Sequence, residues 1–270
     1  MTDKLKSPLK WAGGKRKIAH LILQHWNGGR IVEPFCGGCS VSMLANPPVA
    51  LCSDLNKSLI LFWKHAQFDG VVRNLVNDHI VANNQCDYNL ARNWYNQMLA
   101  TDGLALTRRK ILFLRHELFY YLNMTCFNGL YRVNSSGEFN VPFGKRLTIP
   151  VYQEWGELFE RLRNFVFMHT PYDEVCTEVG DFVYIDPPYD TGFASYTSDG
   201  FSWDAQERLA QWAKGLGKGR CVVISNFATS RIVKLYEKYG FTISPITTTH
   251  TISANGVRPS VQEIIAVLKT

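Results

Sequence analysis

The order of elements between residues 30 and 54 constrains the fold more than any other feature of the sequence. An apolar run at 30–35 enters the glycine turn Cys36-Gly-Gly-Cys39. A short helix is expected at 42–46, and a second strand at 49–54 ends on an acidic residue. This strand, glycine turn, helix, strand and acid order is typical of a nucleotide-binding βαβ unit.

The same α/β alternation returns in the last third of the chain. The elements expected there are strands at 181–186, 220–225 and 262–268 and helices at 205–216 and 230–239. The middle is different. Residues 55–127 have a mostly helical pattern, with a basic amphipathic segment at 106–122, and the Ser-Gly corner within 131–141 indicates a β-hairpin. We therefore predict a discontinuous α/β domain (1–55 and 160–270) interrupted by a mostly helical insert with a hairpin (56–159).

Composition supports a folded cytosolic enzyme with an acidic partner. Lys and Arg number 29 against 23 Asp and Glu, an excess that fits nucleic acid but is common in other enzymes. No stretch reaches the roughly 18 apolar residues of a membrane helix, and the first residues do not resemble a signal peptide. The seven scattered cysteines are expected to be reduced thiols. The histidines form no cluster with cysteines or acids, so no metal is expected.

The tetrad Asp186-Pro-Pro-Tyr189 carries the most chemical information. It follows an apolar strand, and ligands bind at the carboxyl edge of open α/β sheets. Two prolines make a stiff turn that leaves the Pro187 carbonyl free of local helix bonding. The Asp186 carboxylate and that carbonyl can accept both hydrogens of one amino group, while Tyr189 offers a face for a planar base. The alternative is an ordinary Pro-Pro turn with Asp186 as a cap.

Two further segments are weaker signals. Glu33-Pro-Phe-Cys-Gly-Gly38 matches neither a dinucleotide G-x-G-x-x-G turn nor a Walker loop, and its CxxC spacing also suits a redox pair. Asp54 lies where an acid can bind ribose hydroxyls, or it caps a helix. Near the start, Gly13-Gly14-Lys15 is half a phosphate loop, and Trp11 is either a cofactor contact or core packing.

Together these segments resemble the DNA adenine methylase (Dam) family over nearly the whole chain and in family order. The residues that carry the resemblance are Lys10-Trp-Ala-Gly-Gly-Lys15, Glu33-Pro-Phe-Cys-Gly-Gly38, Asp54-Leu-Asn56, Phe127-Asn-Gly-Leu-Tyr-Arg132, Gly137-Glu-Phe-Asn-Val-Pro-Phe-Gly144 and Asp186-Pro-Pro-Tyr189, with weaker echoes in Ile224-Ser-Asn226 and Ser253-Ala-Asn-Gly256. The resemblance implies a Rossmann-like S-adenosylmethionine-dependent methyltransferase sheet with a target-recognition insert.

The resemblance also implies the site residues. Asp186, with Pro187 and Tyr189, holds the target amine. The residues expected to bind S-adenosylmethionine are Trp11, Lys15, Glu33, Phe35, Gly37, Asp54 and Asp186. A redox pair is then unnecessary, because Cys36 and Cys39 flank the glycines of the cofactor loop.

The partner that the resemblance implies is double-stranded DNA, methylated at adenine N6 within GATC, with no obligatory protein partner and no membrane. A base inside a duplex must be rotated out before it can react. Phe127 and Asn128 lie where family members wedge side chains into the vacated stack. The other expected contacts are Leu130, Arg132 and Pro142 to bases, Lys10 to an outer guanine, and Lys145 to a phosphate. The alternatives are a hairpin core for Phe127, a surface salt bridge for Arg132 and a solvated charge for Lys145.

Some family members have Tyr in place of Phe127 and Arg in place of Lys145; base stacking survives the first change and a phosphate contact survives the second. Tyr196, on a Gly- and Ser-rich loop at 193–200, is expected to close over the flipped adenine, or that loop is simply mobile. The rival activities are cytosine-N4 methylation and RNA amino-methylation. A DNA-binding protein of the same fold without activity is the rival from another class.

Overall fold

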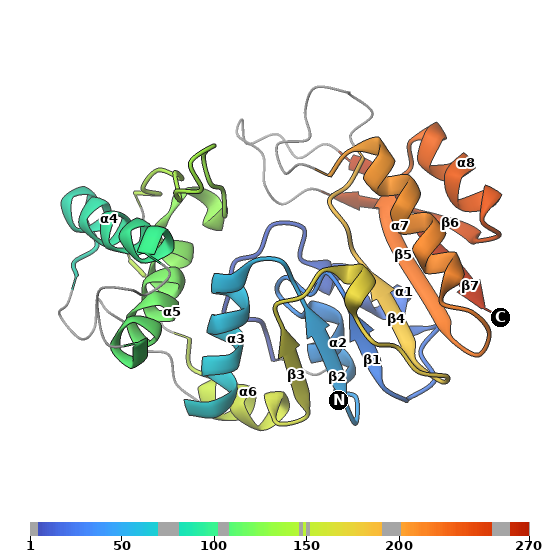
Figure 1. Cartoon of the computed structure of the whole chain (residues 1–270), viewed down its shortest axis with the longest axis horizontal. Helices are drawn as coiled ribbons and strands as arrows, with labels where there is room; N and C mark the ends of the chain where they lie inside the picture. Colours follow the sequence, from blue (N-terminus) through green and yellow to red (C-terminus); the bar gives the residue numbers. More distant parts are fainter. Residues whose placement is uncertain are drawn as a thin grey trace. The chain divides into compact units, whose positions relative to one another are not determined.

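The computed structural model describes residues 5–69, 81–101, 108–145, 148–149, 152–190, 201–249 and 260–269 (Figure 1). The helices are η1 (Lys15–Lys17), α1 (Ala19–Leu23), α2 (Ser40–Ala45), α3 (Lys57–Asp69), α4 (Gln85–Thr101), α5 (Arg108–Thr125), η2 (Phe127–Gly129), α6 (Trp155–Leu162), η3 (Tyr172–Glu174), α7 (Trp203–Gly215) and α8 (Ser230–Lys238). The strands are β1 (Ile31–Glu33), β2 (Ala50–Ser53), β3 (Phe165–Met168), β4 (Phe182–Ile185), β5 (Cys221–Phe227), β6 (Thr242–Thr249) and β7 (Ser260–Lys269).

The seven strands form one sheet in the order β3-β2-β1-β4-β5-β7-β6. Strands β2, β1, β4 and β5 run parallel to one another, and β7 pairs antiparallel with both β5 and β6. The order departs from a doubly wound 3-2-1-4-5-6 sheet only by the antiparallel strand inserted before the last one. The predicted α/β, Rossmann-like class is confirmed.

By compactness the chain divides into two units. Unit 1 contains residues 1–15, 37–44 and 56–169, and unit 2 contains 16–36, 45–55 and 170–270. This geometric division is separate from the functional division into a catalytic domain and a recognition insert, which stays a prediction.

Unit 2 holds most of the sheet because its strands are apolar on both faces. All four residues of β4 are buried, as are all four of β2, which suits parallel strands that helices cover on both sides. Helices α7 and α8 pack against each other (Figure 1). Each begins at a side-chain cap: the Ser202 hydroxyl accepts from the Ala205 amide, and the Thr229 hydroxyl accepts from the Ile232 amide.

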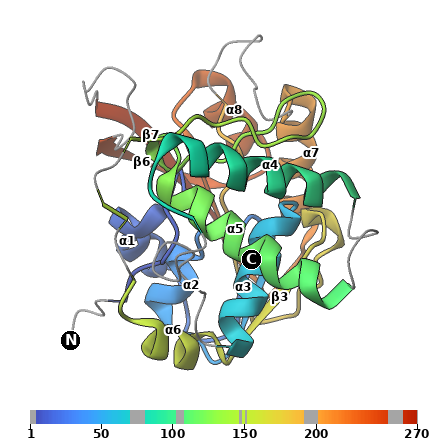
Figure 2. The same cartoon turned by 90° about the vertical axis from the view of Figure 1, so that its left-hand side faces the viewer.

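Unit 1 is built around helix α5, which packs against α3 on one side and α4 on the other (Figure 2). Its core is aromatic. Phe62 and Tyr120 stack at 5.7 Å between ring centroids, and Trp63 stacks on Phe167 at 5.8 Å. The helix expected at 106–122 is present from Arg108 and continues three residues beyond its expected end. Its described side chains, at 115–125, are all buried, so this part of the helix is not amphipathic as expected.

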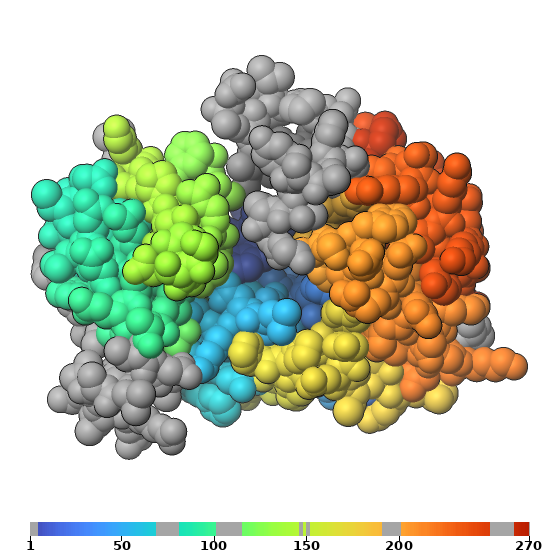
Figure 3. Space-filling view, turned by 45° about the horizontal axis from the view of Figure 1, so that its top comes forward, coloured from blue at the N-terminus to red at the C-terminus, as the bar shows by residue number. Residues whose placement is uncertain are grey.

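The hairpin expected at 131–141 is present as a short antiparallel turn with one β-bridge between Val133 and Phe139. The Gly137 amide donates to the Asn134 carbonyl to close the corner. In Figure 3 this part of the chain lies beside α4 on the surface of unit 1. The hydrogen bond from Tyr88 on α4 to the Val141 carbonyl, 2.7 Å long, holds the two together.

The elements missing from the prediction are α1, α6, β3 and β6, besides short 3-10 helices. Strand β6 was missed because it is an edge strand in which Thr, Ser and Pro outnumber two isoleucines, so it carries little of the apolar signal that marks a buried strand. Strand β3 and helix α6 lie beyond the helical stretch whose pattern we followed only to residue 127. Within the described residues, no helix is long and apolar enough to cross a membrane.

Candidate active site

The carboxyl ends of the parallel strands of unit 2 form one edge of the sheet, and polar residues gather there. Glu33 ends β1, Asp54 follows β2, Asp186 follows β4, and Ser225 and Asn226 lie near the end of β5. The order of the strands reverses between the parallel neighbours β1 and β4, because β2 and β3 extend the sheet on one side and β5 extends it on the other. Open α/β sheets bind ligands at such a switch point. The fold therefore brings together at one edge acids that are up to 153 residues apart in sequence (Glu33 to Asp186).

Asp186 is held by a chain of two hydroxyl groups. The Ser225 hydroxyl donates to Oδ1 of Asp186 at 2.9 Å, and the Tyr184 hydroxyl lies 2.8 Å from the Ser225 oxygen. Serine has one hydroxyl proton, and it is given to the carboxylate, so Tyr184 donates to Ser225. Burial, with the Asp186 charge nearby, raises the pKa of Tyr184 well above its usual value, which keeps the phenol protonated for this task.

The two proline carbonyls in the turn after Asp186 differ in their hydrogen bonding. The Pro188 carbonyl accepts a 2.8 Å hydrogen bond from Nε2 of Gln206, whereas no donor among the described residues reaches the Pro187 carbonyl. Pro187 itself is buried and Pro188 is exposed. The carbonyl that the tetrad needs for binding an amine is thus the one the fold leaves available.

The Tyr189 side chain is fixed at both its ring and its hydroxyl. The hydroxyl donates to Glu263 on β7 at 3.1 Å, and the ring meets Phe227 edge to face at 4.9 Å. Burial, the Asp186 charge and Glu263 raise the pKa of Tyr189 well above its usual value. A neutral tyrosine with an anchored hydroxyl gives a flat surface whose orientation is set before any base arrives.

The next residue, Asp190, is a buried acid with several donors. Its carboxylate accepts from the Thr229 hydroxyl at 3.0 Å and from two nitrogens of Arg231, one of them Nε at 2.6 Å. The Arg231 guanidinium also lies 4.8 Å from the centre of the Trp203 ring. This bidentate pair ties the end of the tetrad turn to the first turn of α8.

Glu33 and Asp54 are the acids expected at the cofactor. Glu33 is 2% exposed at the end of β1, and Asp54 is half-buried. The alternative role of Asp54 as the cap of α3 falls to Asn56, whose Oδ1 accepts from the Leu59 amide at 3.1 Å. Nearby in sequence, the Phe35 ring stacks on Tyr172 at 5.4 Å, which builds an aromatic wall in unit 2.

In unit 1, Trp11 packs on the glycine turn. A Cβ at Gly37, whose φ is +45°, would lie 2.6 Å from Nε1 of Trp11, so only glycine fits beneath the indole. The indole also meets Phe119 and Tyr131 at 6.4 and 6.3 Å. The Gly37 carbonyl accepts from the Trp63 indole at 2.9 Å, and Cys36 and Cys39 are buried thiols that form no disulfide.

Lys15 is buried, with 9% of its surface exposed, and its ammonium donates to the Gly13 carbonyl. A buried lysine requires a compensating acceptor. The Gly13-Gly14 turn supplies such an acceptor, the Gly13 carbonyl. In this structure the half phosphate loop therefore binds the ammonium of Lys15.

The expected DNA-contacting residues other than Lys10 and Tyr196 lie in residues 126–145, which we call the recognition segment. The Phe127 amide donates to the Pro142 carbonyl at 2.8 Å, so these two residues lie side by side near the two ends of the segment. Phe127 is 41% exposed, which excludes the hairpin-core alternative. Asn128 is exposed in a left-handed conformation with φ of +55°, and Lys145 is exposed with φ of +50°.

Lys10 is attached to the base of the recognition segment. Its ammonium donates to the Met124 carbonyl at 2.8 Å, and its backbone exchanges hydrogen bonds of 2.9 and 2.8 Å with the side chain of Asn123. A Cβ on Gly129 would lie 2.4 Å from that of Lys10. The structure therefore places Lys10 beside the segment although 117 residues separate it from Phe127 in sequence.

Arg132 is exposed, and its Nε donates to Oδ1 of Asn140 across the hairpin at 2.8 Å. Backbone pairing supports the contact, because the Asn140 amide donates to the Arg132 carbonyl. This partner replaces the salt bridge that was the alternative role for Arg132. Asn140 thus occupies the Nε edge of the guanidinium, and the planar group holds its two terminal nitrogens in a fixed fork.

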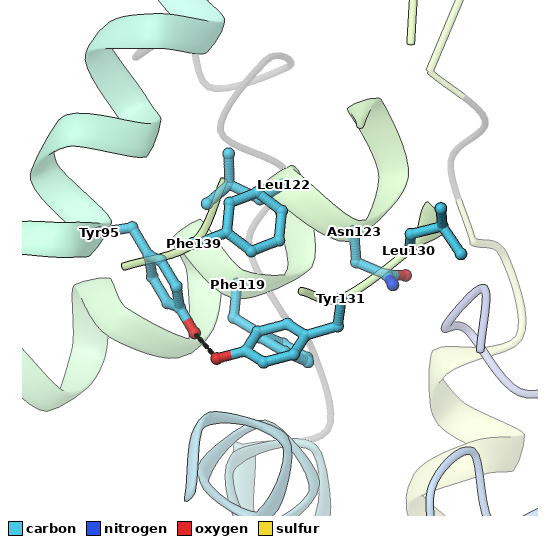
Figure 4. Close-up of a pocket in the computed structure, with 7 residues that line it drawn as sticks. All are labelled: Tyr95, Phe119, Leu122, Asn123, Leu130, Tyr131 and Phe139. Carbon is cyan, nitrogen blue, oxygen red and sulfur yellow. Dashed lines mark hydrogen bonds between the residues drawn. The ribbon is translucent and has the colours of Figure 1, made fainter. Parts of the chain in front are cut away.

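A mostly aromatic cluster packs between the recognition segment and helices α4 and α5. It is lined by Tyr95, Phe119, Leu122, Asn123, Leu130, Tyr131 and Phe139 (Figure 4). The hydroxyls of Tyr95 and Tyr131 lie 3.3 Å apart, and burial raises the pKa of both. Leu130, Tyr131 and Phe139 come from the recognition segment and the other four residues from helices α4 and α5, so the cluster joins the segment to the helical core. Tyr196 with its loop and the Ser253–Gly256 echo lie outside the described residues.

The match to known proteins extends over most of the sequence. Residues 11–252 match the family of D12 class N6 adenine-specific DNA methyltransferases. The chain belongs to this family. It is 35% identical over 269 residues to a retron DNA adenine methylase of Escherichia coli, covering 96% of this chain and 90% of that protein. It is 32% identical over 280 residues to a DNA adenine methylase of Vibrio cholerae, covering 98% and 96%. It is 31% identical over 275 residues to a type II methyltransferase of Lactococcus lactis, covering 95% and 93%.

Family membership decides between the rival activities. As an adenine-specific DNA methyltransferase, the chain acts on the amino group of adenine rather than on cytosine N4 or RNA. Sequence reasoning missed several residues that hold the site of this methyltransferase: Gln206, Asn226, Asp190 and Asn140. Gln206 carried a signal, because it interrupts the apolar face of α7 formed by Ala205, Leu209 and Ala213. A buried glutamine on such a face needs polar partners.

Proposed function

We propose that the enzyme transfers the methyl group of S-adenosylmethionine to N6 of an adenine rotated out of double-stranded DNA, within the sequence GATC. The observation that carries this proposal is the state of the tetrad. One oxygen of Asp186 is engaged by Ser225, and no described residue donates to the Pro187 carbonyl. Two acceptors that can serve one amino group lie next to each other in the chain.

The chemistry follows from those acceptors. Hydrogen bonds from both amine hydrogens turn the nitrogen lone pair out of conjugation with the purine ring and make it nucleophilic. S-adenosylmethionine supplies a methyl on a sulfonium, which leaves as a neutral thioether when N6 attacks. The carbon–nitrogen bond forms as the carbon–sulfur bond breaks, and the amine proton passes by way of Asp186 to solvent. Tyr189 stacks on the base and holds it in line.

The residues at the sheet edge fit the cofactor. Glu33 and Asp54 are acids at the ends of β1 and β2, where ribose hydroxyls and a cationic sulfonium or amino group find acceptors. The stacked Phe35 and Tyr172 rings offer an apolar wall for the adenine of the cofactor. The roles of Trp11, Lys15 and Gly37 in cofactor binding stay part of the proposal.

The DNA is read by the recognition segment. Exposed Phe127 and Asn128, near the start of the segment, form a wedge, with Pro142 fixed beside Phe127. Arg132 presents a fork that suits the O6 and N7 of guanine, a pairing worth about 1–3 kcal/mol of discrimination. Lys10 and Leu130 contact bases, and Lys145 contacts a phosphate.

The first test measures transfer of labelled methyl to unmethylated duplexes that carry GATC or a scrambled site. Label at adenine N6 in the GATC duplex alone supports both activity and target, whereas equal label in both duplexes overturns the target. Asp186→Asn should abolish transfer because the amine loses its carboxylate acceptor. Asp204→Asn is the matched control, since Asp204 is exposed on α7.

The second test concerns base rotation. A GATC duplex with 2-aminopurine in place of the target adenine becomes more fluorescent when that base leaves the stack. The wild-type enzyme should raise the fluorescence, and Phe127→Ala should reduce the rise because the vacated stack is no longer filled. An unchanged signal with Phe127→Ala contradicts the wedge role.

A further inference from the structure

Two buried side-chain amides hydrogen-bond to the backbone on either side of Tyr189. Gln206 donates from Nε2 to the Pro188 carbonyl at 2.8 Å, and Oδ1 of Asn226 accepts from the Asp190 amide at 3.0 Å. The two amides are joined, because Nδ2 of Asn226 donates to Oε1 of Gln206 at 3.2 Å. Gln206 is 1% exposed and Asn226 is fully buried.

The direction of these hydrogen bonds is determined. The chain starts at a backbone N–H, which can only donate, and ends at a backbone carbonyl, which can only accept. Both side-chain amides therefore have one permitted orientation, and each bond polarises the next in the same sense. Asn226 is fixed further, since Nδ2 donates to the Tyr236 hydroxyl at 3.1 Å and Oδ1 accepts from the Phe227 amide.

The two side-chain amides take the place of backbone hydrogen bonds that the turn cannot make. Pro187 and Pro188 have no N–H, so the segment that leaves β4 cannot continue as a paired strand. The φ of Pro188 is locked, so a single soft torsion, the ψ of Pro188, lies between its carbonyl and the Pro187 carbonyl. Holding the Pro188 carbonyl with Gln206 therefore sets the direction of the Pro187 carbonyl, and holding Asp190 limits the tilt of Tyr189.

We propose that Gln206 and Asn226 are positioning residues for methyl transfer, which aim the Pro187 carbonyl and the Tyr189 ring at the target adenine. Neither side chain touches the substrate. They act through the backbone, and their effect belongs to the chemical step more than to DNA binding. A buried polar network costs stability unless every member is hydrogen-bonded. Apolar side chains would fill this space without that cost, so the two buried amides indicate a role other than packing.

The test is Gln206→Glu, which keeps the shape and exchanges the donating nitrogen for an oxygen. At about pH 8 the carboxylate repels the Pro188 carbonyl, and kcat should fall at least about tenfold, the loss that goes with one buried hydrogen bond. Burial raises the pKa of such a glutamate, so its protonated form donates again at about pH 6. The ratio of variant to wild-type kcat should therefore rise as the pH falls, while KM for DNA stays within about twofold because only the chemical step is affected.

The substrate is unmethylated plasmid DNA, which offers every short site, so the outcome rests on the adenine methylation of the family and not on GATC. Gln211→Glu is the matched control, because Gln211 is exposed on the same helix. It should leave kcat and its pH profile unchanged. Asn226→Asp should lower kcat, and the double variant should lower it little further, because both residues act through one chain.

A kcat of Gln206→Glu within about twofold of wild type overturns the positioning role, as does a loss that does not recover at lower pH. If the buried glutamate prevents folding, Gln206→Met replaces it with an apolar side chain of similar length. The methionine variant should be folded, with kcat lowered equally at every pH. Wild-type kcat in that variant would show that the amide only fills space.

Discussion

The hydroxyl of Ser225 donates a 2.9 Å hydrogen bond to the carboxylate of Asp186, across the pair of strands β5 and β4. Ser225 is fully buried, and its own oxygen accepts from Tyr184. One carboxylate oxygen, Oδ1, is thereby held by Ser225. The orientation of the Asp186 carboxylate, which we propose binds the target amine, depends on a residue 39 positions further along the chain.

Ser225→Ala should lower kcat by about tenfold, because a hydrogen bond to a charged group is worth roughly 1.5–3 kcal/mol and the carboxylate loses its fixed rotamer. Single-turnover methylation measures the effect. Ser244→Ala on the exposed face of β6 is the control and should behave as wild type. A normal single-turnover rate for Ser225→Ala would show that Asp186 needs no support from β5.

Gly37→Ala should destabilise the protein by more than 1 kcal/mol (about 1–3 expected), because φ is +45° and the new methyl meets the Trp11 indole. Binding of S-adenosylmethionine should weaken with it. Gly156→Ala is the control, and it should change the free energy of unfolding in the opposite direction. That glycine lies within α6 with no atom near its Cβ, so alanine should stabilise by roughly 0.5–1 kcal/mol. Urea unfolding and calorimetric titration distinguish the two; equal stability of both variants contradicts the packing argument.

Asn140→Ala should reduce sequence discrimination, because Arg132 loses the partner that orients its guanidinium. We expect kcat/KM on GATC relative to a site with one altered guanine to fall by about 3- to 10-fold, part of the 1–3 kcal/mol of a bidentate contact. Arg132→Ala should lose more. Asn164→Ala, an exposed asparagine elsewhere in unit 1, should leave the ratio unchanged. If the kcat/KM ratio is unchanged in Asn140→Ala, Arg132 reads the base without the hydrogen bond to Asn140.

Asp190→Asn should lower the free energy of unfolding by about 1–3 kcal/mol, since the buried carboxylate accepts charge-assisted hydrogen bonds from Arg231. The Arg231 side chain is 38% exposed, so solvent screening keeps the loss below that of a fully buried pair. Urea denaturation at neutral pH measures it. Glu237→Gln, exposed on α8, is the matched control and should change little.

Alkaline pH should destabilise unit 1 through Cys126. Burial raises the pKa of its thiol from 9.0 to about 11, so the folded state favours the neutral form. Its contribution to stability is complete below pH 9 and is lost as the pH rises through 11. Tyr120 and Tyr121, with pKa values raised by burial to about 12, extend the loss upward. Cys126→Ser should flatten the fall in stability above pH 9, whereas Cys86→Ser, at an exposed thiol, should not.

The sequence by itself determined the class of fold and the family, and it located the tetrad on which the proposed chemistry rests. These are local properties: buried parallel strands are apolar runs, and the glycine turn, the double proline and the acids that end strands are consecutive residues. Asp186, Glu33 and Asp54 could be placed at one sheet edge because parallel strands share a direction. The hairpin and helix α5 were visible for the same reason, through a turn signal and a helical period.

Only the tertiary structure decided which groups hold that chemistry in place. Ser225, Asn226 and Gln206 reach the tetrad from β5 and α7, and Lys10 meets Asn123 across 113 residues. A hydrogen bond between residues far apart in sequence leaves no periodicity, and its partners are chosen by which strands become neighbours and which helix covers them. Strand β6, at the edge of the sheet, was missed for a related reason: its backbone pairs with β7, while most of its side chains are Thr, Ser or Pro and give little apolar signal.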